Sequence, residues 1–585
     1  MTGFKKTVKS LLLFKEPEKA ESFVLEETKR EKEEIGDIER EEEKEGNKDN
    51  RNKKHHRIKN TGVGKVFIKQ TGKSEEKQKI AINKDLSINL EYMKKVYSIP
   101  INGDIIIREF DVVFNDKPVS AFIIFYDGLT DRNVINNNIL QPLMILSNLN
   151  IKSDEKNIGQ YIRKNLLPQN QLKYTSVYED IISEINFGGC GIFVDGLDHA
   201  FACDTKGWEH RGVERPNNEL VLRGPQEGFN EVLRVNTGLV RKILKDEDLI
   251  AEDVAVGKIS KTPCSIMYIK DIVNDSLVQE VRRRMRSIKA DYVLDTGQLE
   301  QFLEDSTMLP APLVIDTERP DRVASLLVEG KVAIIMNGSP FALVIPANAT
   351  SLFHSAEDAY IRFPYVNFLR FIRLLAAILS LLLPGIYISI INFHHEMIPT
   401  DLLIAIGASR ERVPFPSLVE LLVMEFSFEL IREAGIRVPG PIGPTLGIIG
   451  ALILGQAAVA ATIVSPILII IVAVTGIGSF AIPSFSMAFS FRIVRIAYII
   501  LGAMAGFMGI SLGLFVHALW LSTSKSFGVP FLAPFAPRTG MTMDDEITRA
   551  PIWKQESRPD YLNTKSTKKQ PGISRGWAEE DKKKR

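Results

Sequence analysis

The apolar and polar positions divide this chain into a mixed N-terminal part and a strongly apolar last third. A run of 54 residues, from Val438 to Phe491, contains no Asp, Glu, Lys, Arg or His. About 20 apolar residues span a bilayer, so this run is too long for one crossing and fits two. Further apolar stretches lie at Leu374–Phe393 and Ile496–Ser524. The pattern predicts an integral membrane protein whose spans are confined to the last third.

Four membrane-spanning helices account for these stretches. We expect them at residues 374–393, 445–463, 466–485 and 496–521. This layout places Arg492 and Arg495 outside the cytoplasm, which conflicts with the preference of positive charge for the cytoplasmic side. A crossing by Ser417–Ile431 would change the parity, so the number of crossings stays open.

The regions that flank the spans are both predicted to be cytoplasmic. Met1–Phe14 holds only a short apolar run among lysines, which is not the pattern of a signal peptide. Arg362, Arg370 and Arg373 precede the first span, and positive charge beside a span favours the cytoplasmic side. The tail from Lys525 to Arg585 carries thirteen Lys and Arg against eight Asp and Glu. An even number of crossings follows from these signals.

From about Ile101 to the first span, strand patterns alternate with helix patterns. Val119–Tyr126 and Ser265–Ile269 are rich in apolar, β-branched and aromatic residues, which is typical of buried strands. Helical patterns lie between such strands, at Asn133–Leu146, Val177–Ile185, Asn230–Leu244 and Ser276–Ile288. This region is therefore predicted to have an α/β fold.

Acidic residues that follow two of the strands indicate an internal repeat. Asp127 and Asp131 follow the first strand, and Asp271 and Asp275 follow the second. The offset is 144 residues for both pairs, and a helix pattern comes next in each case. Self-similarity at a fixed offset is the sign of a duplicated unit.

Each half of the repeat ends in a predicted β-hairpin. Its turn is Asp195-Gly196 in the first half and Asn337-Gly338 in the second. Both pairs suit a two-residue type I′ turn, whose two central positions need positive φ. Two α/β subdomains of like design are therefore expected, at roughly residues 101–215 and 241–348. Chance similarity between common α/β patterns is the alternative.

The predicted fold class is an α/β soluble N-terminal region of two similar subdomains, followed by an α-helical polytopic membrane domain. Glu26–Lys59 is a charge run with few apolar residues, so the N-terminal extension is expected to be mostly disordered. The expected parts are residues 1–95 (charged extension), 96–215 and 216–360 (α/β subdomains 1 and 2), 361–524 (membrane domain, with an amphipathic helix at 417–434) and 525–585 (basic cytoplasmic tail).

The charged helix expected at 417–434 is the segment best suited to carry function. Its Glu425, Glu429, Arg432 and Glu433 are spaced to share one helix face. Charges beside long apolar spans are costly in lipid and usually face a bundle interior, a water-filled path or the interface. In one interpretation this helix lines or gates a polar path, with its glutamates exposed to ions. In the other it is interfacial, and its carboxylates pair with arginines of the same segment.

Small residues recur four positions apart in the apolar segments. Such pairs let helix backbones approach closely. They indicate tight packing, either between copies of the chain or inside one copy. The pairs are Gly443 with Gly447, Ala451 with Gly455, Gly502 with Gly506, and Gly509 with Gly513.

No pattern predicts catalysis, a metal centre or a cofactor. Cys190, followed by Asp195 and His199, is better explained as a small core residue before a turn than as a nucleophile. His394-His395-Glu396, directly after the first span, has the residue types of a metal site or pH sensor, but an exposed loop is favoured. Basic residues are not interleaved with aromatic ones, so no nucleic acid partner is expected. We predict that the protein is not an enzyme.

Several segments together resemble one family, the A subunits of GerA-type spore germinant receptors of endospore-forming bacteria. The resemblance runs from about residue 95 to 535, and its motifs occur in the family's order. They are GGCGIFVDG (Gly188–Gly196), RGPQEGFNE (Arg223–Glu231), NTGLVRKIL (Asn236–Leu244), HHEMIP (His394–Pro399), PFPSLVELLVMEFSFELIREAGIRVPGPIG (Pro414–Gly443) and LGIIGALILGQAAV (Leu446–Val459). The charged extension before residue 90 is longer than this family's pattern.

The resemblance implies a role in nutrient-triggered spore germination. Receptors of this kind combine A, B and C subunits in the spore inner membrane, and the B subunit is expected to bind the nutrient. The A subunit is similar to a ligand-gated channel protomer, which implies a pentameric ring that releases ions. The implied partners are B and C subunits, further copies of this chain and membrane lipid. A relative similar to the stage V sporulation protein AF is an alternative within the family.

Two hypotheses for the mechanism follow. In the first, a cation path runs along 417–443, with Glu425, Glu429 and Arg432 among its pore residues. Val438 or Ile442 would form an apolar ring that keeps the gate dry. In the second, the chain is a non-conducting membrane scaffold whose α/β domains recruit receptor or germination partners.

Overall fold

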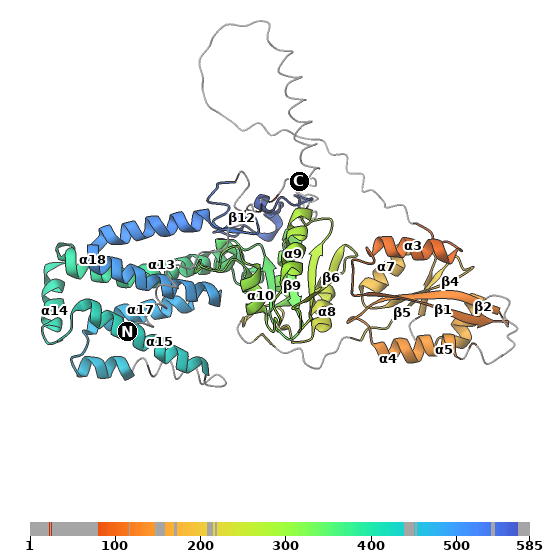
Figure 1. Cartoon of the computed structure of the whole chain (residues 1–585), viewed down its shortest axis with the longest axis horizontal. Coiled ribbons are helices and arrows are strands. Elements are labelled where there is room, and N and C mark those ends of the chain that lie inside the picture. Colours follow the sequence, from red (N-terminus) through yellow and green to blue (C-terminus); the bar gives the residue numbers. More distant parts are fainter. Residues whose placement is uncertain are drawn as a thin grey trace, which may run out of the picture.

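Two α/β subdomains and a helical region lie in a row along the longest axis of the molecule (Figure 1). This computed structural model describes Phe23, Leu25 and residues 80–115, 117–145, 147, 158–168, 172–207, 215–216, 219–437, 450, 453–539 and 545–570. The predicted fold class is confirmed, because two α/β sheets come first and apolar helices follow.

Subdomain 1 is built on five antiparallel strands, β1 (Ile105–Phe114), β2 (Lys117–Tyr126), β3 (Leu172–Thr175), β4 (Cys190–Val194) and β5 (Ala200–Cys203). Their spatial order is β1-β2-β4-β5-β3. The last six residues of β2 are all buried, because helices cover both faces of the sheet. One face is covered by α3 (Leu86–Val96) and α7 (Tyr178–Asn186), and the other by α4 (Arg132–Val134), α5 (Gln141–Met144) and α6 (Ile158–Tyr161), with π-helical turns between them.

Subdomain 2 repeats this design with β6 (Leu249–Val256), β7 (Thr262–Ile269), β8 (Ile315–Thr317), β9 (Val332–Met336) and β10 (Ala342–Ile345). The spatial order is β6-β7-β9-β10-β8, which is the order of subdomain 1 strand for strand. One face packs on α8 (Leu233–Ile243) and α11 (Pro320–Glu329), and the other on α9 (Asp275–Ser287) and α10 (Thr296–Leu303).

The repeat extends to single hydrogen bonds at the predicted turns. Asp195 Oδ1 accepts from the first backbone N–H of α3, at Leu86, over 3.2 Å. Asn337 Oδ1 accepts from the first backbone N–H of α8, at Leu233, also over 3.2 Å. The expected two-residue type I′ turns are wrong, because five residues separate β4 from β5 and β9 from β10. In each connection the polar side chain instead accepts a hydrogen bond from the first N–H of a helix. Positive φ is found at the glycine of each pair but not at Asp195 or Asn337.

Subdomain 1 begins earlier than the expected boundary at residue 96. Helix α3 lies in the extension that was expected to be mostly disordered, yet its Asn89 and Met93 are buried against the sheet. Before α3, Ile82 N donates to Ser176 O over 2.8 Å, which adds this segment to the subdomain. Apart from Phe23 and Leu25, residues 1–79 lie outside the described part of the chain.

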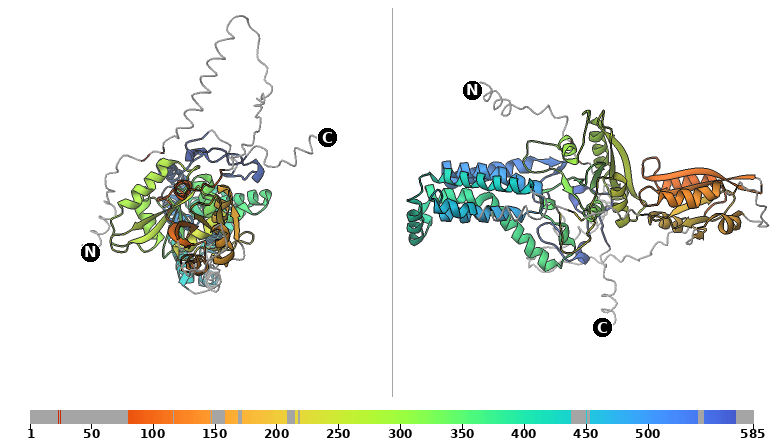
Figure 2. Two further views of the ribbon diagram at one scale, coloured as in Figure 1. Left: turned by 90° about the vertical axis from the view of Figure 1, so that its right-hand side faces the viewer. Right: turned by 90° about the horizontal axis from the view of Figure 1, so that it is seen from below.

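The helical region contains α13 (Phe363–Phe393), α14 (Thr400–Arg410), α15 (Ser417–Arg437), α17 (Pro466–Phe480) and α18 (Phe485–Thr523). Its long helices run side by side along the longest axis, and α14 lies at the end far from subdomain 2 (Figures 1 and 2). By length and composition, α13 and α18 are apolar enough to cross a membrane. The first expected span, 374–393, lies in α13, and most of the third, 466–485, lies in α17.

Helix α18 reverses its direction at Gly506, so it is a helical hairpin. Gly506 has φ +60° and ψ −142°, a conformation that favours glycine. Tyr498 Oη and His517 Nδ1, 19 residues apart, are hydrogen-bonded over 3.1 Å. A straight helix would separate these residues by about 28 Å along its axis. The arms before and after Gly506 are about 30 and 26 Å long, close to the thickness of the hydrocarbon core.

This reversal corrects two expectations about the spans. Residues 496–521 do not form one crossing, because they include both sides of the turn. Arg492 and Arg495, which fall between two of the expected spans, belong instead to the first arm of α18 and are buried. An uninterrupted apolar run carries no signal for the direction of its helix, so the turn is invisible in the hydropathy pattern. The start of the span expected at 445–463 lies outside the described residues.

The C-terminal tail returns to subdomain 2. Phe527 and Phe531, shortly after α18, and Leu562, farther along the tail, are fully buried there. The tail includes a small hairpin of β11 (Lys525–Ser526) and β12 (Val529–Pro530). Both ends of the helical region are therefore attached to the same subdomain.

Candidate functional site: a buried ion-pair cluster between apolar helices

Helix α15 carries the charged residues that the sequence singled out, and it lies against other helices. Pro416 directly precedes its first residue, Ser417, consistent with the exclusion of proline from helix interiors. Leu421 is fully buried against α13 and α17, whereas Phe426 and Leu430 are 66% and 54% exposed. One apolar face of α15 therefore points away from the molecule, and its charged face points into the bundle.

The charged face of α15 meets two arginines of the first arm of α18. Glu425 Oε2 lies 2.9 Å from Arg495 Nη2. Glu429 lies 3.1 Å from Arg492 Nη1 through Oε2, and 3.5 Å from Arg495 Nη2 through Oε1. Glu429 Oε1 also lies 3.2 Å from Arg432 Nη1 on its own helix. We call these five side chains the bundle cluster.

Four of the five side chains of the bundle cluster are at most 10% exposed, whereas Glu429 is 39% exposed, and the cluster is only partly hydrogen-bonded. The side chains of Arg495 and Glu425 are 2% and 9% exposed. Among the described residues, Arg495 Nε and Nη1 and Glu425 Oε1 lie buried without a hydrogen-bond partner. Moving such ions out of water costs several kcal/mol each unless close partners replace the water. The cluster is therefore an ion-pair network with unused donors and acceptors.

Arg432 connects the bundle cluster to α17. Its Nη2 donates to Ser479 Oγ over 3.1 Å. Its guanidinium carbon lies 5.2 Å from the ring centroid of Phe428 and 4.9 Å from that of Phe480. Aromatic faces attract a guanidinium at such distances, so Arg432 is held inside the bundle from several sides.

The structure brings together residues that the sequence analysis kept apart. Pairing of Glu429 with Arg432 is the contact expected for an interfacial helix, but Arg492 and Arg495 supply the contacts between helices. These two partners were not among the candidate residues singled out from the sequence. A signal for them exists, because they are the only Asp, Glu, Lys or Arg between Val438 and Ser524. A charge inside apolar spans marks a functional site by default.

The two gate candidates and part of the predicted glycine set cannot be placed in this bundle. Val438, Ile442, Gly443 and Gly447 lie outside the described residues. Gly455 is described and lies beside Ile469 of α17.

Glu420 is a further buried carboxylate of α15, and the sequence analysis did not single it out. Its Oε1 accepts a hydrogen bond from the backbone N–H of Ser465, the residue that caps the start of α17. The residue is 1% exposed. A negative charge at a helix N-terminus is stabilised by the unsatisfied N–H groups there. Glu420 therefore fixes α15 against the beginning of α17.

The glycines of α18 lie at close contacts within one chain. A Cβ added at Gly502 would lie 2.6 Å from the carbonyl oxygen of Gly385 in α13. One added at Gly513 would lie 2.8 Å from the Leu501 side chain in the opposite arm, and Gly509 also faces Leu501. With Gly506 at the turn, these positions serve packing inside one copy, which was one of the two alternatives for the small-residue pairs.

His394, at the end of α13, contacts the turn of α18. Its Nε2 accepts from the backbone N–H of Phe507 over 3.4 Å, and the two rings stack with centroids 4.9 Å apart. His395 and Glu396 have side chains that are 57% and 77% exposed, as expected for a loop. The exposed-loop interpretation therefore fits these two residues and is wrong for His394.

Cys190, which was weighed as a nucleophile, lies in the hydrophobic core of subdomain 1. Cys190 is buried in β4 and lies opposite Cys203 of β5, as expected for a core residue. Within the described parts of the chain, no group of three or more His, Cys, Asp or Glu residues is arranged to hold a metal ion.

Comparisons with known proteins match the α/β subdomains and the helical region together. The sequence model of the family described as "Bacillus/Clostridium GerA spore germination protein" matches residues 91–561. Spore germination protein KA of Bacillus subtilis (strain 168) is 38% identical over 87% of this chain and 93% of its own length. Spore germination protein GerLA of Bacillus cereus is 36% identical over 80% of this chain and 94% of its own length. An uncharacterized membrane protein of Bacillus subtilis (strain 168), YfkQ, is 35% identical over 83% of this chain and 93% of its own length.

One solved structure also matches. It is the N-terminal domain of the A subunit of the Bacillus megaterium spore germinant receptor GerK3, at 31% sequence identity. The match covers 46% of this chain and 97% of that one, with a TM-score of 0.37.

Proposed function

The chain belongs to the GerA family of spore germination proteins, and from this premise we propose that it is the A subunit of a spore germinant receptor required for nutrient-triggered germination. The similarity supports this because it covers the α/β subdomains and the helical region together. Its partners would be receptor B and C subunits, and it would be located in the spore inner membrane. The nutrient would bind to a partner subunit.

The proposal includes an ion-release channel formed by several copies of the chain, with five as the expected number. The bundle cluster is the observation that carries it, because it places charged side chains between apolar helices. Ionisable groups at such positions are costly in lipid and commonly mark ion paths. The exposed apolar face of α15 supplies a surface for lipid or for another copy.

In this proposal the structure corresponds to a closed state. Glu425 and Glu429 are paired with arginines, so the negative charge of each carboxylate is already balanced and attracts a cation less strongly. Opening would shift α15 relative to α18 and exchange arginine partners for permeating cations. Nutrient binding would need to favour the open state by only a few kcal/mol. Val438 and Ile442 remain the proposed apolar gate, directly after α15.

The test is ion current through the purified, cross-linked oligomer in a planar bilayer, alone and with B and C subunits and nutrient. The double variant Glu425→Gln with Arg495→Gln removes both charges of one pair, and Glu429 keeps Arg432 and Arg492 as partners. We expect altered cation selectivity or conductance. Glu411→Gln, an exposed glutamate outside the cluster, is the matched control and should conduct as the unmodified protein does.

Unchanged selectivity and conductance in the double variant would place the path elsewhere. Val438→Ala and Ile442→Ala should each make the channel leaky without nutrient. Unaltered ion release and germination in both would remove these residues from the gate.

One observation favours a second candidate function. Because Glu425 and Glu429 have arginine partners, the bundle cluster also holds helices together without any ion. The chain would then be a non-conducting scaffold whose α/β subdomains recruit partners. A well-formed complex with B and C subunits that responds to nutrient in spores yet never carries current supports the scaffold.

A further inference from the structure

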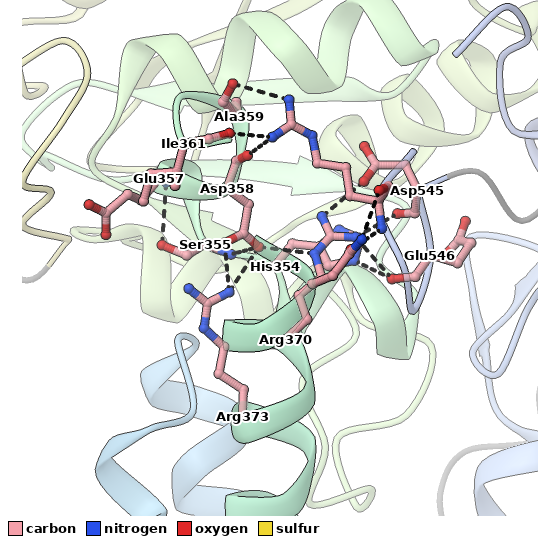
Figure 3. A network of polar contacts seen from close by, with 12 residues as sticks. His354, Ser355, Glu357, Asp358, Ala359, Ile361, Arg370, Arg373, Asp545 and Glu546 are labelled. Carbon is pink, nitrogen blue, oxygen red and sulfur yellow. Dashed lines mark hydrogen bonds and ion pairs between the residues drawn. The ribbon is translucent and has the colours of Figure 1, made fainter. Parts of the chain in front are cut away.

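Three segments that are far apart in the sequence meet at the base of α13 (Figure 3). They are the connection at residues 354–361, the first turns of α13, and residues 545–549 of the tail. The connection joins subdomain 2 to the helical region. We call this meeting point the α13 joint.

Asp358 is the centre of the joint. Its two oxygens each lie 2.8 Å from Arg373 Nη1, and Oδ2 also accepts from Arg370 Nε over 3.2 Å. The Asp358 and Arg370 side chains are 4% and 7% exposed. Both arginines belong to α13, so this one carboxylate connects the helix to the last turn before it.

The tail completes the joint through Arg549. Its guanidinium donates to the main-chain carbonyls of Asp358, Ala359 and Ile361. Its own main chain is paired twice with the Asn367 side chain of α13, over 2.7 and 3.2 Å. Arg549 therefore binds the connection and the helix at the same time.

A second set of contacts joins the tail to the other side of Arg370. Arg370 Nη2 lies 2.9 Å from Asp545 Oδ1, and its Nη1 donates to two tail carbonyls. His354 Nε2 donates to Glu546 O over 2.7 Å. Burial, together with the charge of Arg370, lowers the pKa of His354 to about 3, so its ring is neutral at physiological pH.

Beyond the joint, the tail follows subdomain 2 toward subdomain 1. Arg558 Nε donates to Val328 O over 2.7 Å, and Lys565 N donates to Ile272 O over 2.9 Å. Close to that point, Lys270 Nζ donates to Ser98 Oγ of subdomain 1 over 2.9 Å. The tail thus spans subdomain 2 from its contact with subdomain 1 to the base of α13.

We propose that Asp358, Arg370 and Arg549 are positioning residues that make the α13 joint rigid, so that a movement of subdomain 2 is passed to α13 without loss. This inference rests on the proposed receptor function and assigns its coupling element. A buried network whose members are hydrogen-bonded on several sides moves as one body. Without the joint, subdomain 2 could move while α13 stays in place, and the receptor would assemble but respond poorly.

The first test compares Arg549→Met with Arg538→Met in spores that carry the full receptor. Both remove a tail arginine, but Arg538 is exposed. For Arg549→Met we expect receptor abundance near that of the unmodified strain and a rise of roughly tenfold in the nutrient concentration for half-maximal germination, which is within the usual range of coupling effects. Arg538→Met should change neither. An unchanged nutrient response in Arg549→Met at normal abundance would overturn the proposal.

The second test replaces the joint by a reversible covalent bond. Asn367→Cys with Arg549→Cys removes Arg549 and places two thiols at neighbouring positions, and the native cysteines are all buried. In the reduced state we expect the weak response of Arg549→Met. Oxidation, or a short thiol-reactive cross-linker, should restore the response because the bond makes the joint rigid again. A response that is lost on cross-linking would show that the joint must open, and would refute the proposal.

The control pair is Ile272→Cys with Lys565→Cys, which joins the tail to subdomain 2 far from α13. Its response should be the same in both redox states. A strain that lacks the chain separates the two levels of inference. If that strain germinates normally on every nutrient, the proposed receptor function is refuted. If that strain fails to germinate but the joint variants respond to nutrient as the unmodified protein does, only the proposal for the joint is refuted.

Discussion

The α13 joint and the bundle cluster are both largely buried networks of arginines and carboxylates, yet they use their polar atoms differently. At the joint, Arg549 donates to three main-chain carbonyls, and Asp358 accepts from two arginines. In the bundle cluster, Arg495 meets the carboxylates through Nη2 alone, and its Nε and Nη1 lie unpaired. At the joint, Asp545 Oδ1 is the one described side-chain atom that lies buried without a hydrogen bond, against four such atoms in the bundle cluster, so similar residues produce a better satisfied network in one place than in the other.

The difference comes from where the partners are attached. Main-chain carbonyls at the joint belong to a folded turn and cannot leave without local unfolding. The partners in the bundle cluster are side chains on two separate helices, and side chains can exchange partners when helices shift. A satisfied polar network is rigid, whereas a partly satisfied one has several arrangements of similar free energy. The joint is suited to transmit movement, and the bundle cluster is suited to rearrange.

The largest expected effect comes from Arg370→Met, which removes the central arginine of the joint. Asp358 and Asp545 would lose a partner while they stay buried or half-buried. Breaking a buried ion pair from one side costs about 3–5 kcal/mol. Thermal unfolding of the purified protein in detergent, together with its abundance in membranes, measures this loss. A cost under about 1 kcal/mol would mean that the joint is not a satisfied network.

The same substitution in the bundle cluster, Arg495→Met, should cost less, about 1–3 kcal/mol. It leaves Glu425 without its partner, but it also removes two guanidinium nitrogens that are buried and unpaired. The same thermal measurement applies, with Arg370→Met as the matched variant. If Arg495→Met is the more damaging of the two, the contrast between the networks is wrong.

Gly502→Ala tests how closely α18, which carries the arginines of the bundle cluster, packs against α13, which carries those of the joint. The added methyl group would lie 2.6 Å from Gly385 O, so α13 and α18 must separate. Overpacking of this kind costs about 1–3 kcal/mol. Gly407→Ala on α14 is the control, because nothing lies within 4 Å of its added methyl group. This control should gain about 0.5–1 kcal/mol, as expected for alanine in a helix.

The smallest expected effect concerns a partly buried carboxylate in subdomain 2, which lies near other carboxylates instead of arginines. Burial, and then the charges of Glu304 and Asp316, raise the pKa of Glu300 on α10 from 4.5 to about 8. Between these values the folded state binds more protons than the unfolded state. Stability from this group is therefore fully present below pH 4.5 and is lost as the pH rises through 8.

Glu300→Gln should remove this loss. At pH 8.5 we expect its thermal midpoint to lie above that of the unmodified protein by about 2–4 °C, and the difference should vanish near pH 5. Unfolding of the purified protein across this pH range provides the measurement. An equal difference at both pH values would point to packing instead of protonation.

Much of the α/β region could be predicted from local patterns. The apolar content of β2 and β7 identified two strands, and the 144-residue offset of the aspartates indicated the duplication. The matching strand orders and the paired contacts of Asp195 and Asn337 are properties of the folded chain. The sequence pattern suggested turns at these two residues but could not show that their side chains hold a helix start.

The helical region was less predictable, and the reason is physical. Hydropathy reports how apolar a segment is, but it does not report the direction in which the helix axis runs. The reversal at Gly506 and the two arms of α18 therefore could not be predicted from it. Arg492 and Arg495 could have been singled out as isolated charges, but their partners lie 63 and 70 residues earlier on another helix. Pairing across such distances depends on how helices pack.

The sequence by itself determined the division into an α/β part and an apolar helical part, because burial and secondary structure follow from local patterns of residue types. It also determined the family, through motifs spread along most of the chain. Only the tertiary structure decided which charges meet in the bundle cluster, and that the tail returns to bind the base of α13. Those contacts join residues up to 192 positions apart, and a contact at that range forms only after the whole chain has folded around it.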